Sequence, residues 1–121
     1  MKLHEVELFS SDPEVSANLF SSLLGLKMNV DQPGLKVFNA TDGVDLNISN
    51  HQPSNKVSLS FLVKDINAFI QSVREKKGEV SDIYDSHLGL RGVTLADNDL
   101  CRIVVHSPTK VSPEWLQNMV G

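Results

Sequence analysis

The sequence predicts an α+β fold of two βαβββ modules. The first observation is a repeat: a strand pattern, a capping aspartate, a helical pattern and a glycine occur twice in this order. Asp12 and Asp65 are 53 positions apart, and so are Gly25 and Gly78. Such a repeat indicates a duplicated unit that buries a shared face with its twin.

The second observation is the bulk composition. With 121 residues, of which 40% are hydrophobic, the chain predicts a single domain, 1–121, with one core. Its net charge of -4 argues against a nucleic-acid partner. The single cysteine, Cys101, suits a reducing compartment, and no stretch is apolar enough for a signal peptide or a membrane span. We therefore expect a cytoplasmic protein with no membrane partner.

The first module is predicted at about residues 3–49. Residues 3–9 alternate like a strand. Asp12 then has the position of a helix N-cap, with Pro13 at the first helical position. An apolar stripe follows at helical spacing, and Gly25 is expected to end the helix in the left-handed conformation. The predicted stripe consists of Val15, Leu19 and Leu23, with Phe20 and Leu24 beside them.

Three short strands complete this module at residues 27–30, 35–40 and 44–49. Pro33-Gly34 divides the first two, and Asp42-Gly43 is a strong hairpin signal between the last two. The polar stretch 50–56 is the expected connector to the second module.

The second module is predicted at about residues 57–107. Strand 57–63 precedes Asp65, which caps a helix whose apolar residues follow the i, i+3, i+4, i+7 spacing. Strands are expected at 80–84, 88–95 and 100–106, with a turn at 97–99. The tail, 108–121, carries one short helical pattern at 112–120, and packing on the body is its default role.

This arrangement resembles the vicinal oxygen chelate superfamily, which includes glyoxalase I, bleomycin-resistance proteins, methylmalonyl-CoA epimerase and extradiol dioxygenases. The resemblance rests on the two βαβββ units, on the first-module pattern Asp12, Ala17, Phe20 and Leu24-Gly25-Leu26, and on segment 97–104. It covers about residues 3–107. The resemblance implies that the two modules form a curved mixed sheet cup with helices on its outer face, and it implies a homodimer.

In metal-using members of this superfamily, four inward strand positions hold a divalent ion. The resemblance places these positions at Glu5, Ser49, Ser58 and Val104, of which only Glu5 is a credible metal ligand. Valine and neutral hydroxyl groups do not provide the donors that a catalytic ion needs. We therefore expect no metal cofactor and lean against an enzyme.

Strand parity predicts which side chains face the cup. If that face is enclosed, its carboxylates need cations or hydrogen bonds; if it is open to water, they are ordinary solvated acids. The predicted ligand-binding residues are Glu5, Glu7, Phe9, Asp45, Asn47, Ser58, Ser60, Arg102 and His106.

Two of these residues have competing interpretations. Arg102 can neutralise Glu5 or Glu7, which the composition favours, or it can bind a carboxylate or phosphate of a ligand. His106 is the best candidate for a general acid or base, although its place near a strand end favours a solvated histidine. Cys101 shares the parity of the helix side and is expected to be a buried thiol.

Three functions follow. The favoured one is a metal-free protein, similar to bleomycin-resistance proteins, that binds a small and possibly cationic ligand in the cup. The first alternative is a metal-dependent lyase, isomerase or dioxygenase with an altered ligand set. The second is a structural or regulatory dimer whose cup is filled by its own side chains.

Overall fold

A computed structural model describes residues 1–121 except 42, 52–56, 98–100 and 121. The chain divides into two compact units, residues 4–59 and residues 1–3 with 60–121. Three predicted features lie wholly or mostly outside the described residues. They are the connector 50–56, the Asp42 position of the first hairpin and the turn at 97–99. That the two modules together form one cup stays a prediction.

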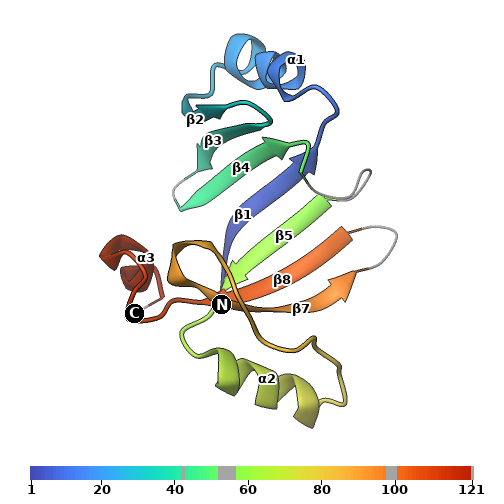
Figure 1. Ribbon diagram of the computed structural model, residues 1–121, viewed down its shortest axis with the longest axis vertical. Coiled ribbons are helices and arrows are strands. Elements are labelled where there is room, and N and C mark those ends of the chain that lie inside the picture. The colour runs from blue at the N-terminus through green and yellow to red at the C-terminus, as the bar shows by residue number, and fades with distance from the viewer. Residues whose placement is uncertain (42, 52–56, 98–100, 121) are drawn as a thin grey trace. The chain divides into compact units, whose positions relative to one another are not determined.

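The first unit has the predicted βαβββ order (Figure 1). Its strands are β1 (Lys2–Phe9), β2 (Met28–Gln32), β3 (Leu35–Thr41) and β4 (Val44–Ser49). They are ordered β2-β3-β4-β1, so the first strand lies beside the last. β1 and β4 are parallel, and the β2–β3 and β3–β4 pairs are antiparallel. The sheet is therefore mixed, as predicted.

The first helix begins as predicted. It consists of α1 (Pro13–Asn18), which continues into a π-helical turn, η1 (Leu19–Leu23). The Asp12 side chain accepts a hydrogen bond of 3.3 Å from the Val15 backbone N–H, which satisfies one of the free donors of the first turn. Gly25, with a φ of +71°, follows the helix in the left-handed conformation that glycine adopts at least cost.

The predicted apolar stripe of this helix is wrong except for Phe20. Val15, Leu19 and Leu23 are 70%, 51% and 76% exposed, whereas Ala17 is buried. Successive helical residues differ by about 100°, so Ala17 lies on roughly the opposite side of the helix from Val15. Ala17 packs with Phe38 and Ile48 of the sheet, and Phe20 joins this cluster. The side that contacts the sheet therefore carries a small residue, which allows close approach.

The second unit repeats the order with a shorter edge. Its strands are β5 (Val57–Leu62), β6 (Tyr84–Asp85), β7 (Arg91–Asp97) and β8 (Cys101–Ser107), ordered β5-β8-β7-β6. The β6–β7 and β7–β8 pairs are antiparallel. The structure thus confirms an α+β fold with two βαβββ modules.

Two strand predictions need correction in this unit. Of residues 80–84, only Tyr84 lies in a strand. The Ser81 N–H donates to the Thr94 carbonyl oxygen, but the Thr94 N–H donates to the Ser81 hydroxyl instead of to a backbone carbonyl, so a regular strand ladder does not form there. Residues 88–90 do not form a strand. Leu88 instead lies in the short 3₁₀ turn η2 (His87–Gly89), where its φ is +57°.

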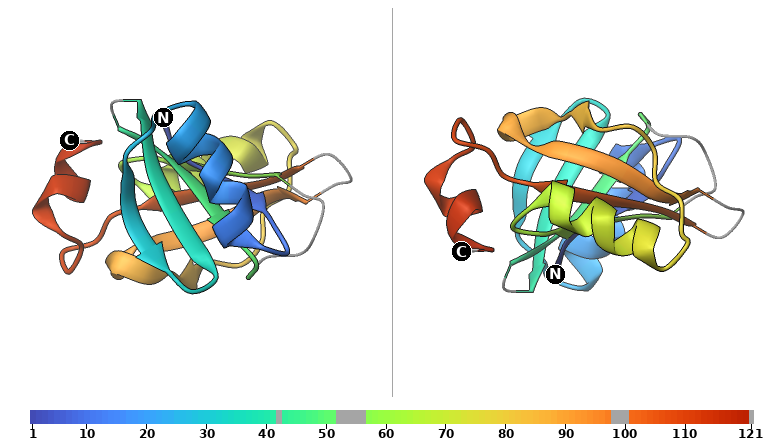
Figure 2. Two further views of the ribbon diagram at one scale, coloured as in Figure 1. Left: turned by 90° about the horizontal axis from the view of Figure 1, so that it is seen from above. Right: turned by 90° about the horizontal axis from the view of Figure 1, so that it is seen from below.

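Helix α2 (Ile66–Glu75) covers one face of this unit's strands, as Figure 2 shows. The Asp65 side chain accepts from the Asn67 backbone N–H at 2.9 Å, as expected for an N-cap. Ile66 and Ile70 are buried against Val93 of β7 and Val105 of β8. These contacts confirm the predicted apolar spacing.

The last helix, α3 (Glu114–Asn118), also packs on this unit. Leu116 is fully buried against Leu62 and Leu90. Leu62 lies between two residues whose side chains pack towards α2, so its own side chain points away from α2. The tail therefore packs on the body, as predicted. No helix among the described residues is long and apolar enough to cross a membrane.

Candidate functional site

An acidic face lies on the first unit, on the side of the sheet that points away from α1. Glu5 of β1 pairs with Asp45 of β4, and Glu7 pairs with Asn47. Directly paired residues of neighbouring strands project to the same side, and Ile48, which alternates with them, packs towards the helix. We call Glu5, Glu7, Asp45 and Asn47 the acidic face. In this unit the four residues therefore share one side of the sheet.

Polar neighbours stabilise each acid of this face. The Ser49 hydroxyl donates to Glu7 Oε1 at 2.9 Å. The side chain of Asn47 hydrogen-bonds Glu5, and that of Asn39 hydrogen-bonds Asp45. Among the described residues, however, the Asn47 side-chain oxygen is buried and has no hydrogen-bond donor. A buried acceptor of this kind favours a ligand that carries an N–H or O–H group.

Glu5 has the most perturbed carboxyl group of the face. Burial raises the pKa of Glu5 to about 7, and the negative charges of Glu7 and Asp45 contribute in the same direction. The hydrogen bond from Asn47 acts against this shift. Burial also raises the pKa of Asp45 above its usual range, opposed by the hydrogen bond from Asn39. Near neutral pH, Glu5 therefore exchanges a proton readily.

This arrangement supports two kinds of chemistry. A bound cation would lower the pKa of Glu5, because an opposite charge nearby favours the ionised carboxylate. Glu5 can equally act as a general acid or base, since its pKa lies near neutral pH. Cation binding and proton transfer both depend on acids of neighbouring strands that lie close together. The pattern of one strand predicts this proximity only in part.

Asn39 is a site residue that the sequence interpretation missed. It pairs with Asp45 across the β3–β4 ladder, and so it shares the acidic face. Strand parity along 35–40 could have identified it, because Asn39 shares its parity with Leu35 and Val37, which face the same side of the sheet. Phe9 and Ser49 also pair on this side of the sheet, at the end of β1.

The remaining predicted ligand-binding residues are Ser58, Ser60, Arg102 and His106. Ser60 and His106 are buried, whereas Ser58 and Arg102 are half-buried. Whether they share a ligand with the acidic face stays a prediction, and so does the pairing of Arg102 with Glu5 or Glu7.

His106 is not the solvated histidine that its strand-end position favoured, because only 4% of it is exposed. Its ring packs edge-on against Tyr84, with centroids 6.1 Å apart, and lies 6.3 Å from the ring of His87. It also lies over Gly92, where an added Cβ would come within 2.6 Å of His106 Cδ2. The missing side chain of Gly92 therefore makes room for the imidazole.

One other prediction also changed, since Cys101 is half-buried rather than fully buried. His4, near the start of β1, is buried, with 8% of it exposed.

The donor set does not fit the divalent ion that this fold holds in metal-using proteins. Ser49 already donates its hydroxyl proton to Glu7, and Val104 has no donor atom in its side chain. Among the described residues, no three His, Cys, Asp or Glu side chains group as a metal site would require. We therefore derive no reaction step through a metal.

The structure of this chain is similar to several solved structures. A glyoxalase/bleomycin resistance protein/dioxygenase superfamily member from Vibrio splendidus 12B01 matches with a TM-score of 0.67 and 19% identity, over 88% of this chain and 99% of that one. Methylmalonyl-CoA epimerase from Mycobacterium tuberculosis matches with a TM-score of 0.59 and 13% identity, over 89% of this chain and 88% of that one. This chain has the vicinal oxygen chelate fold.

Proteins with different names share this vicinal oxygen chelate fold. A protein named NAD-dependent benzaldehyde dehydrogenase, from Legionella pneumophila, matches with a TM-score of 0.65 and 15% identity, over 87% of this chain and 98% of that one. No protein-family model and no curated protein matches the sequence. At these identities the likeness establishes the fold alone, because one scaffold hosts unrelated sites.

Proposed function

We propose that this protein binds a small basic molecule on the acidic face. The observation that carries the proposal is the grouping of Glu5, Glu7 and Asp45 on one side of the sheet, where burial and the negative charges of Glu7 and Asp45 raise the pKa of Glu5 to about 7. An ammonium or amidinium group would relieve this repulsion. Its N–H groups would also donate to the buried oxygen of Asn47.

The proposal extends to the setting of this binding. We infer a metal-free site like that of bleomycin-resistance proteins, in a cytoplasmic homodimer whose two modules act as one domain. The donor set described above supports the metal-free part. The cytoplasmic location rests on the single cysteine, which suits a reducing compartment.

Calorimetric titration with benzylamine, tryptamine and benzamidine tests the binding. We expect saturable binding that weakens about tenfold in Glu7→Gln, because a neutral amide removes one attractive charge. Binding should also weaken when the salt concentration rises and when the pH falls below about 7, since Glu5 is then protonated. In buffers of different ionisation enthalpy, the heat should report proton release near pH 6.5.

Two controls make this titration specific. Glu79→Gln removes an exposed acid outside the acidic face and should leave the affinity unchanged. Benzyl alcohol has the same ring without the charge and should not bind. Binding that is insensitive to salt, or no binding across the panel, would refute the proposal.

Proton transfer by Glu5 is the second candidate function, and its pKa near neutrality favours it. Such an enzyme would move a proton at a carbon next to a carbonyl group. Uptake of deuterium from solvent into a carbonyl compound, abolished in Glu5→Gln, would favour this function over simple binding.

A further inference from the structure

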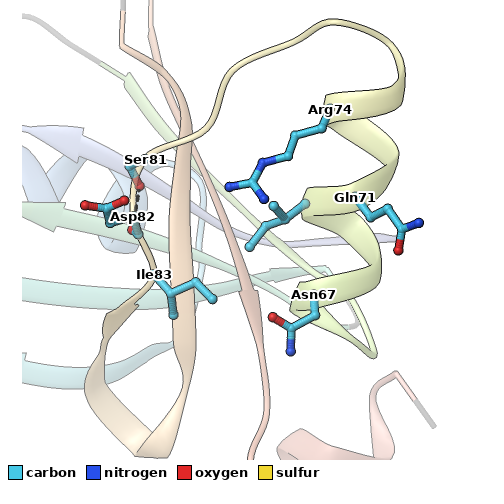
Figure 3. A pocket seen from close by; sticks show the side chains of 7 residues that line it. Asn67, Gln71, Arg74, Ser81, Asp82 and Ile83 are labelled. Atoms are coloured by element: carbon cyan, nitrogen blue, oxygen red, sulfur yellow. Dashed lines mark hydrogen bonds between the residues drawn. The ribbon is translucent and has the colours of Figure 1, made fainter.

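A groove lies on the second unit, between α2 and the segment that precedes β6. Its volume is about 530 Å³. Its walls come from the helix and from the facing segment, which Figure 3 shows on either side of the groove. The lining residues are Asn67, Ile70, Gln71 and Arg74 of the helix and Ser81, Asp82 and Ile83 of the facing segment. All of these residues belong to one compact unit.

Both walls of the groove are held in place. The Asp65 cap fixes the start of α2. On the facing wall, the Ser81 backbone N–H donates to the Thr94 carbonyl oxygen at 3.0 Å, and the Thr94 N–H donates to the Ser81 hydroxyl at 2.8 Å. A groove between fixed walls needs little ordering when a ligand enters, which favours binding.

Arg74 and Asp82 are the charged residues that line the groove. In Figure 3 the Arg74 guanidinium extends from α2 into the space between the two walls, whereas the Asp82 carboxylate points away from the helix. The Gln71 amide donates to Glu75 Oε1 on the same helix. Among the described residues, the Arg74 side chain has no hydrogen bond or ion pair. On a chain with a net charge of -4, an arginine without a carboxylate partner can accept an anion from outside.

The centre of the groove is apolar. Ile70 and Ile83 belong to the hydrophobic cluster beneath α2, and they line the space between Asn67 and Arg74. Asn67 and Arg74 are seven positions apart on the helix, which corresponds to about 10 Å along the axis. A ligand of this length would place its apolar body on the two isoleucines.

We propose that this groove binds an amphipathic carboxylate. The guanidinium of Arg74 would hold the carboxylate through two parallel N–H groups, a geometry that lysine cannot reproduce. Ile70 and Ile83 would cover the apolar body, and the Asn67 amide would meet a polar group at its far end. This site is separate from the acidic face, and its ligand has the opposite charge.

Titration of the protein with 4-phenylbutyrate, followed by amide chemical shifts, tests the proposal. We expect saturable shifts at residues 67–74 and 81–83. Arg74→Gln should weaken binding at least tenfold, and Arg74→Lys should weaken it less. Lys76→Gln is the matched control, because it removes a neighbouring exposed charge that does not line the groove; its affinity should match that of the wild type.

Two further ligands separate charge from apolar contact. The neutral 4-phenylbutanamide and the short acetate ion should both bind at least tenfold more weakly. Equal binding of the amide would overturn the role of Arg74, and equal binding of acetate would overturn the role of the isoleucines. Unchanged affinity in Arg74→Gln would overturn the whole inference. Glu5→Gln should leave this titration unaffected, so its outcome is independent of the acidic face.

Discussion

Glu5 is a single carboxyl group whose behaviour depends on its neighbours across the sheet. Burial and the charges of Glu7 and Asp45 favour its protonated form, and Asn47 favours its ionised form. Because the pKa of Glu5 rises from 4.5 to about 7 on folding, the folded protein retains a proton that the unfolded chain releases.

The stability of the protein should therefore depend on pH through Glu5. Below pH 4.5 both states are protonated and no penalty exists; between pH 4.5 and 7 the unfolded chain ionises first, so stability falls as the pH rises. Glu5→Gln should remove a loss on the order of 2 kcal/mol. Urea denaturation at pH 4 and pH 8 measures this. A difference between variant and wild type that is the same at both pH values would contradict the assignment.

The sequence predicted the orientation of these residues but not their environment. Alternation along strands 3–9 and 44–49 placed Glu5 and Asp45 on one side, since parity depends only on position. The burial of His106 could not be predicted in this way. It results from Gly92, Tyr84 and His87, which reach the imidazole only through the β6–β7–β8 pairing.

Helices show where element-level prediction succeeds. The Asp12 and Asp65 caps are local signals, and both helices begin at the predicted residues. The apolar face of α2 was also predicted, because its isoleucines follow one clear spacing. In α1 and η1, apolar residues occur on several sides, so the sequence alone did not reveal that Ala17 contacts the sheet.

The tail helix α3 offers a direct test of packing at this scale. Leu116→Ala should lower the free energy of unfolding by about 2–4 kcal/mol, because Leu116 is fully buried against Leu62 and Leu90. Trp115→Ala is the control on the same helix, since Trp115 is 58% exposed, and it should cost less than about 1 kcal/mol. Chemical denaturation measures both. Similar losses in the two variants would show that α3 is not attached through Leu116.

At the scale of the whole molecule, the repeat was the most reliable signal. It predicted two βαβββ modules, and the strand order of each unit confirms them. Residues 80–90, at the edge of the second unit, differed from the predicted strands. A hydrogen bond to the Ser81 hydroxyl replaces a strand hydrogen bond there, and Leu88 lies in a turn with a left-handed conformation. Neither feature has a periodic signature in the sequence.

The resemblance implies a homodimer, which is a property of the whole molecule. Several large apolar side chains of residues 15–24 are exposed on the single chain. Sedimentation equilibrium should give about twice the chain mass of 13.3 kDa at micromolar concentration. A mass of one chain across that range would contradict the prediction.

Lys36 has a consequence for chemical labelling of the protein. Its amine forms ion pairs with Asp31 and, at 3.1 Å, with Glu14, and its side chain is buried. The hydrogen bond with Asp31 raises the pKa of Lys36, so the unprotonated amine that attacks an ester reagent is scarce. Amine-reactive dyes should therefore modify the exposed lysines first, and late modification of Lys36 would report opening of the first unit.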